Sequence, residues 1–254
     1  SNTASGYRAL RNNTTGDNNT ATGNDALYYN TTGYKNTANG LQALTRNTTG
    51  RANTAVGDHA LWRVTTSSFN TAIGGSALFN STGSQNTANG FFALYNNTTG
   101  DNNVAIGYAL YNNTTGSQNT AIGHNADVGS GDLTNATAIG NGAIVTVSNK
   151  IRLGNTDVTT IEGQVAFSNA SDRRLKKDIV DTRYGLNTVL ELRPVDYQMK
   201  SNNLEQIGFI AQELRPIVPE AVTGIEGDLD KGETLGVAYT TLIPVLTKAI
   251  QEQQ

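Results

Sequence analysis

The chain has 254 residues and a formal net charge of −3, so it lacks the basic excess that general attraction to nucleic acid requires. It contains no cysteine, which excludes disulfides and thiolate metal sites. No run approaches the roughly 20 apolar residues of a membrane-spanning helix. We therefore expect no nucleic-acid partner, no membrane insertion and no cofactor.

The composition changes near Ala170. Residues 1–170 hold 8 Lys and Arg, 8 Asp and Glu, and no proline, in a background of Asn, Thr and Gly. Residues 171–254 hold 10 basic and 13 acidic residues and all four prolines, which is typical of a globular domain. Because the sequence begins inside a repeat, we interpret it as a piece of a longer protein.

A repeat of 16 or 17 residues occupies the first part. Most copies contain Asn-Thr-Ala-x-Gly, then Ala-Leu, then a turn such as Asn-Thr-Thr-Gly. The alanine of the first pattern recurs at Ala4, Ala21, Ala38, Ala55, Ala72, Ala88, Ala105, Ala121 and Ala138. Two short strand-like pieces and two turns per copy predict the coils of a parallel β-solenoid. Glycine or a turn interrupts each apolar piece too soon for a helix.

The residue before the glycine becomes apolar along the repeats. It is Ser, Thr or Asn in the first three copies, and it is apolar in five of the six later copies, at Val56, Ile73, Ile106, Ile122 and Ile139. These side chains either fill the interior of the solenoid or form a stripe that packs between chains. Because each coil supplies few large apolar residues, a single solenoid is expected to be marginal, which favours a homotrimer.

The motif Asn-Thr-Ala-Ile-Gly-x-x-Ala-Leu resembles the head repeats of trimeric autotransporter adhesins of the YadA type. The resemblance covers residues 1–145 and implies a trimeric left-handed parallel β-roll. The repeat here is longer than in that family and carries an additional Asn-Thr-Thr-Gly turn. Residues 146–170 alternate in polarity without the repeat, and we expect a β-rich neck there.

Residues 171–254 predict a small α+β domain. Tyr184–Leu192 has a helical pattern, a strand is expected after Pro194, and the Ile-Gly-Phe-Ile-Ala segment reads as another. The chain ends in a predicted helix from about Thr240. Leu242, Leu246 and Ala249 have heptad-like spacing there, which suits either a three-stranded coil or packing on the same domain.

Three blocks of this part carry a second resemblance: SDRRLKKDI from residue 171, IGFIAQEL, and YTTLIPVLTKAIQEQQ. In that order they resemble the intramolecular chaperone domain of endosialidase-type phage tailspikes, which trimerises, assists folding and cuts itself off. The resemblance implies cleavage between Ala170 and Ser171, with Ser171 as nucleophile and Lys176 as base. The enzyme would act once on its own chain and would not turn over.

The chemistry of such a pair is demanding. A serine hydroxyl needs a base, and lysine can serve only if burial or neighbouring charge lowers its pKa from about 10.4 toward about 7 or 8. Arg173, Arg174 and Lys177 would add like charge, and a trimer interface would add desolvation. Either an N-to-O acyl shift followed by ester hydrolysis or attack by an activated water is compatible with this arrangement. A fibre whose chaperone domain has lost cleavage and stays attached is the alternative.

Other activities are less favoured by the sequence. His59 and His124, the only histidines, lie several coils apart, so no metal site is predicted. No glutamate precedes Glu162, whereas a glycosidase requires two carboxylates beside the scissile bond. We expect an extracellular fibre on a cell surface or virion, with a surface glycan or another receptor as partner. Six aromatic residues are candidates either for stacking on sugars or for packing between chains: Tyr28, Tyr29, Trp62, Phe91, Phe92 and Tyr95.

Overall fold

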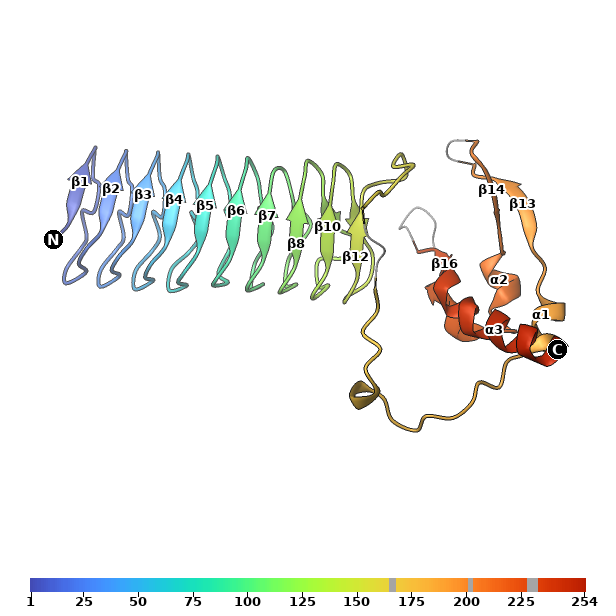
Figure 1. The fold of residues 1–254 in the computed structure, drawn as a ribbon. Coiled ribbons are helices and arrows are strands. Elements are labelled where there is room, and N and C mark those ends of the chain that lie inside the picture. The colour runs from blue at the N-terminus through green and yellow to red at the C-terminus, as the bar shows by residue number, and fades with distance from the viewer. Residues whose placement is uncertain (165–167, 201–202, 228–232) are drawn as a thin grey trace. The chain divides into compact units, whose positions relative to one another are not determined.

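The structure is a computed structural model that describes residues 1–164, 168–200, 203–227 and 233–254. The chain divides into two compact units, Ser1–Asn155 and Thr156–Gln254. Figure 1 shows the coils of the first unit stacked in chain order, while the second unit is smaller and mixes short helices with hairpins.

The first unit contains a ten-stranded parallel sheet in which each strand pairs with the sheet strand of the next coil. Its strands are β1 (Thr3–Ser5), β2 (Thr20–Thr22), β3 (Thr37–Asn39), β4 (Thr54–Val56), β5 (Thr71–Ile73), β6 (Thr87–Asn89), β7 (Val104–Ile106), β8 (Thr120–Ile122), β10 (Thr137–Ile139) and β12 (Ile151–Leu153). Ala4 pairs with Ala21 and Ala21 with Ala38, so the sequence repeat is also the structural repeat. The predicted parallel β-solenoid is confirmed.

The interior of the solenoid is narrow and contains mainly alanine and leucine. Neighbouring residues of a strand point to opposite sides. In β2, for example, the central Ala21 is fully buried while Thr20 and Thr22 are exposed. Ile73, Ile106, Ile122 and Ile139 also lie on the outer side and are about 40 % exposed. Of the two alternatives for this position, filling of the solenoid interior is therefore excluded for these four isoleucines.

The Ala-Leu pairs were predicted to be strand-like, but through most coils they lie in turns. Leu27 has a φ of +52° and Leu44 a φ of +51°, the left-handed region that a branched side chain rarely adopts. In this conformation Leu27 is fully buried, and its N–H donates to the carbonyl of Ala43 in the next coil at 3.0 Å. A second pair of strands, β9 (Asp127–Val128) and β11 (Ile144–Val145), forms only in later coils.

Glycine at the end of the repeated strand is required by close approach of the coils. Gly23 has a φ of +128°, and a Cβ on it would lie 2.4 Å from the carbonyl oxygen of Gly40. Any side chain there would collide with the backbone of the next coil, which accounts for the presence of this glycine in every copy of the repeat.

Buried asparagines connect the coils in two rows. In the first row the Oδ1 of Asn19 accepts from the N–H of Asn36 at 3.0 Å, and its Nδ2 donates to the carbonyl of Gly33 at 2.8 Å. In the second row the Nδ2 of Asn30 donates to Oδ1 of Asn13, and Asn47 donates likewise to Asn30, both at 2.7 Å. These bonds satisfy polar groups that burial would otherwise leave without partners.

The second unit has the following helices and strands. They are the 3₁₀ turn η1 (Arg173–Leu175), α1 (Leu186–Glu191), β13 (Val195–Gln198), β14 (Glu205–Gly208), α2 (Ala211–Leu214), η2 (Pro219–Ala221), β15 (Val222–Gly224), β16 (Leu235–Val237), η4 (Tyr239–Thr241) and α3 (Leu242–Gln253). β13 pairs with β14 and β15 with β16, each antiparallel. Leu214, Val218, Ala221 and Leu242 form its small core.

The final helix α3 has two apolar sides. Leu242, Val245 and Ala249 are buried within the unit. Ile243, Leu246 and Ile250 are 59 %, 45 % and 57 % exposed. Of the residues predicted to have heptad spacing, Leu242 and Ala249 therefore pack on their own unit, and the exposed stripe contains Leu246 with two isoleucines.

Candidate functional site

The predicted nucleophile and base lie together. Lys176 Nζ donates a hydrogen bond to Ser171 Oγ at 2.7 Å. Ala170, Ser171 and Lys176 are all exposed in the single chain, so the bond between Ala170 and Ser171 is accessible. The arrangement brings a hydroxyl, an amine and a neighbouring peptide carbonyl into one place, which is the set of groups that self-cleavage needs.

A tight turn produces this contact from a spacing of five residues. The N–H of Leu175 donates to the carbonyl of Asp172 at 3.0 Å, and that of Lys176 donates to Arg173 at 3.1 Å. These bonds define η1, which has no buried residue. The chain therefore folds back on itself between Ser171 and Lys176 without support from a hydrophobic core.

Asp172 caps this turn. Its carboxylate accepts from the backbone N–H of Arg174 at 2.8 Å and from the Arg174 guanidinium, with Nη2 at 2.7 Å and Nε at 3.1 Å. The Arg174 side chain, followed by the Arg174 N–H, lowers the pKa of Asp172. Sequence reasoning counted Arg174 among the like charges acting on Lys176. That interpretation needs correction, because Asp172 offsets the charge of Arg174.

The stretch before the site contains one strand of the solenoid sheet. Within residues 146–170, β12 pairs with β10, and the described residues from Gly154 onward form neither helix nor strand. Residues 165–167 of the predicted neck lie outside the described part of the chain.

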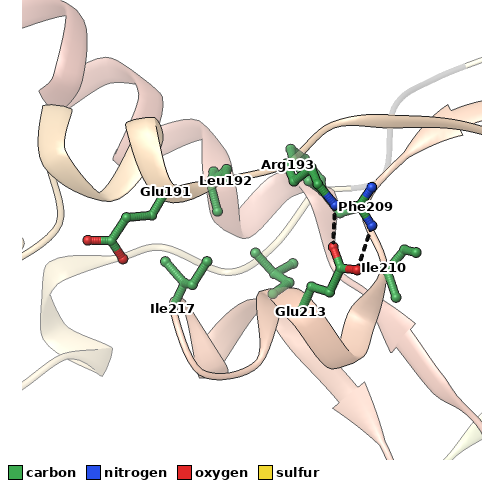
Figure 2. Close-up of a pocket in the computed structure, with 8 residues that line it drawn as sticks. Glu191, Leu192, Arg193, Phe209, Ile210, Glu213 and Ile217 are labelled. Atoms are coloured by element: carbon green, nitrogen blue, oxygen red, sulfur yellow. Dashed lines mark hydrogen bonds and ion pairs between the residues drawn. The ribbon is translucent and has the colours of Figure 1, made fainter.

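A separate hollow in the second unit has a volume of about 240 Å³ and is shown in Figure 2. Apolar side chains such as Leu192, Ile210 and Ile217 line it. Arg193 contacts Glu213 there through two hydrogen bonds of 2.9 and 2.5 Å, which lower the pKa of Glu213. The lining contains a satisfied ion pair and no serine, lysine or histidine, so it does not suggest a second catalytic centre.

Aromatic residues form a ladder that sequence reasoning missed. Trp62 stacks on Phe79 with ring centroids 5.1 Å apart, Phe79 on Tyr95 at 5.3 Å, and Tyr95 on Tyr111 at 5.7 Å. The guanidinium of Arg46 lies 4.0 Å from the Trp62 ring. The recurrence of aromatic residues directly after Ala-Leu was the signal. Because the ring faces contact one another, Trp62 and Tyr95 are poorly placed to stack on sugars.

The described residues contain neither a cluster of metal ligands nor a membrane-spanning helix. No group of three His, Asp or Glu side chains gathers there in a way that could hold a metal ion. His59 contacts the adjacent Asp58 at 2.6 Å. None of the helices in the described ranges has the length and apolar character needed to cross a bilayer.

Comparison with known proteins identifies one segment. Residues 171–223 match the family model described as chaperone of endosialidase. The match begins at Ser171 and includes η1, Lys176 and the core residues Leu214 and Val218. No curated protein was found to match the chain.

Proposed function

We propose that the chain is one protomer of a homotrimeric fibre on a cell surface or virion. The solenoid forms the shaft, and the second unit assists trimer folding and then cleaves the Ala170–Ser171 bond. The observation that carries the proposal is the 2.7 Å contact between Lys176 and Ser171, at the first residue of the segment matching the chaperone of endosialidase family. A surface glycan or another receptor is the expected partner of the shaft.

Exposed apolar stripes support self-association. Ile73, Ile106, Ile122 and Ile139 project from equivalent positions of parallel strands, and α3 exposes Ile243, Leu246 and Ile250. The α3 residues have a spacing of three and then four, which is that of a coiled-coil seam. Contact between three copies would remove both stripes from water.

The proposed chemistry begins with transfer of the Ser171 hydroxyl proton to a neutral Lys176. Ser171 Oγ then attacks the Ala170 carbonyl carbon, the C–N bond breaks as the nitrogen takes a proton, and an ester joins Ala170 to Ser171 Oγ. Water hydrolyses that ester, which releases the Ala170 carboxylate and restores the hydroxyl. Direct attack by a water that Lys176 activates would give the same two products.

The exposure of Ser171 and Lys176 in the single chain is a reason to expect that trimer assembly controls cleavage. In the single chain both side chains are exposed to water. A neighbouring protomer that covers the site would favour the neutral amine. The same exposure motivates the alternative function, a fibre whose chaperone unit does not cleave and stays attached as a cap.

The test is intact mass and native mass of the wild type beside Ser171→Ala and Lys176→Ala. The proposal predicts two wild-type fragments separated at Ala170–Ser171, whole chains for both variants, and trimers in every case. Lys200→Ala, which removes an exposed lysine elsewhere in the unit, is the control and should cleave. Trimers of uncleaved wild type would favour the permanent cap instead.

A further inference from the structure

The contact between Ser171 and Lys176 depends on a turn that has little intrinsic stability. η1 is three residues long and buries none of them, and Leu175 is 72 % exposed. Short 3₁₀ turns of this kind do not persist in water without tertiary support. Another interaction must keep the chain folded back, or Lys176 would leave Ser171.

Asp172 and Arg174 provide that interaction. One carboxylate binds both the backbone N–H and the guanidinium of Arg174, so the start of the turn is joined to its centre by four hydrogen bonds of 2.7 to 3.2 Å. Asp172 follows Ser171 directly in the chain. The turn that this ion pair holds therefore begins at the residue next to Ser171 and ends at Lys176.

We propose that Asp172 and Arg174 are positioning residues for self-cleavage, because they hold the turn that keeps Lys176 Nζ beside Ser171 Oγ. The inference rests on the proposed function of this site. The hydrogen bonds of the two side chains are to one another, while Lys176 Nζ donates to Ser171 Oγ.

Stability and reaction rate should respond differently to loss of this pair. The Arg174 and Asp172 side chains are 89 % and 42 % exposed, and exposed ion pairs contribute little to folding. A misplacement of about 1 Å between reacting groups, however, can slow a reaction by roughly 100-fold. Variants should therefore fold and assemble normally and cleave slowly.

The experiment follows cleavage of the full chain over time after cell-free synthesis, with intact mass giving the rate constant. We expect Asp172→Ala and Arg174→Ala to cleave roughly 10- to 100-fold more slowly than wild type. Asp172→Asn should be intermediate, since its Oδ1 can still accept from the Arg174 N–H. The matched control is Arg193→Ala, which removes another exposed ion pair, that with Glu213, and should cleave at the wild-type rate.

Two further readouts separate positioning from folding or electrostatics. The pH–rate profile of the charge-balanced double variant Asp172→Ala/Arg174→Ala should fall in height with an unchanged midpoint, and this variant should be no slower than Asp172→Ala. A lowered melting temperature or lost trimer in the single variants, or a shifted midpoint, would overturn the positioning role.

The inference and the proposed function can fail separately. If Asp172→Ala and Arg174→Ala cleave at the wild-type rate while Ser171→Ala stays whole, the inference is wrong and the peptidase assignment stands. If assembled wild type never cleaves, both are wrong.

Discussion

Asp127 is the residue whose position is least expected in a solenoid interior. It follows Ala126, where earlier coils have leucine after the alanine, and it is 8 % exposed. Its carboxylate accepts from the N–H groups of Val128 at 2.8 Å and Asn112 at 3.1 Å. Burial raises the pKa of Asp127 to about 6, although these two hydrogen bonds oppose the shift.

The raised pKa predicts that Asp127 destabilises the solenoid above pH 6. The folded state binds the proton more tightly than the unfolded chain, whose carboxyl has a pKa near 3.8, so stability is gained as pH falls from about 6 to about 4. A difference of about two pKa units corresponds to about 3 kcal/mol. Asp127→Asn should therefore be more stable than wild type at pH 8 and similar to it at pH 4.

Urea unfolding at both pH values measures this difference. Asp132→Asn is the control, because its hydrogen bond from Ser130 lowers the pKa of Asp132 and the expected pH dependence has the opposite sign. Parallel stability curves for wild type and Asp127→Asn would contradict the burial argument.

Among the elements of the fold, the second asparagine row contains an informative interruption. Val64 replaces asparagine in the coil after Asn47, and the Oδ1 of Asn47 is buried without a partner. In the same coil Ser67 replaces the glycine found in other turns. A Cβ at Gly50 would lie 2.3 Å from Asn47 Oδ1, so the row asparagine and a side chain at the turn position exclude each other.

This exclusion predicts strong coupling between the two positions. Val64→Asn alone should destabilise the solenoid, because its amide would collide with Ser67. Ser67→Gly alone loses the hydrogen bond from Ser67 Oγ to the Thr82 carbonyl and should also destabilise. The double variant should restore the asparagine row and give Asn47 Oδ1 a hydrogen-bond donor. Its free energy of unfolding should therefore exceed the value expected from adding the two single changes by about 1–3 kcal/mol.

A double-mutant cycle by thermal or urea unfolding tests the coupling. Val145→Ala is the control, because Val145 is also buried in the solenoid interior but lies far from Val64 and Ser67. Its destabilisation should simply add to that of either single variant. Simple additivity of the Val64 and Ser67 changes would show that the two positions act independently.

The elements also show what sequence could and could not supply. The recurrence of Ala and Gly predicted the parallel sheet correctly. Each coil needs a small buried residue in its interior and a glycine where the next coil approaches, so both residues recur along the sequence. The Ala-Leu turn was mistaken for a strand, since the left-handed conformation of Leu27 is set by its bond to the next coil and not by local preference.

The candidate site was predicted less directly. Ser171 and Lys176 were named from a resemblance, and their spacing alone does not place them in contact. The contact requires η1, and η1 requires the cap from Asp172, which reasoning from charge alone did not reveal. Trp62 and Tyr95 were considered for stacking on sugars or for packing between chains, and the ladder that they form with Phe79 and Tyr111 was not predicted.

At the scale of the whole molecule, the apolar stripe predicts how the shaft assembles. Ile106 and Ile122 are 42 % and 39 % exposed on neighbouring strands β7 and β8. Because each is only about 40 % exposed, its burial by a second copy would contribute about 0.6–1.2 kcal/mol, whereas a lysine there would place an unpaired charge at the contact. The double variant Ile106→Lys/Ile122→Lys should therefore be monomeric, or should dissociate at a much higher protein concentration than the wild type does.

Native mass across a concentration series measures this effect, with circular dichroism to confirm that the coils remain folded. Thr115→Lys adds a charge at an exposed turn between β7 and β8 and should leave the trimer intact. A double variant that stays trimeric like wild type would show that the stripe is not the contact.

The hydrogen bonds that join the coils also determine how the shaft responds to a pulling force. They run from each coil to the next, as in the bonds from Leu27 to Ala43 and from Thr20 to Asn36, so a pull along the stack opens them one coil at a time. Each opening releases about 17 residues, or roughly 55–60 Å of extended chain. A single solenoid would thus lengthen in regular steps at modest force, dissipating work repeatedly and closing again when the tension falls.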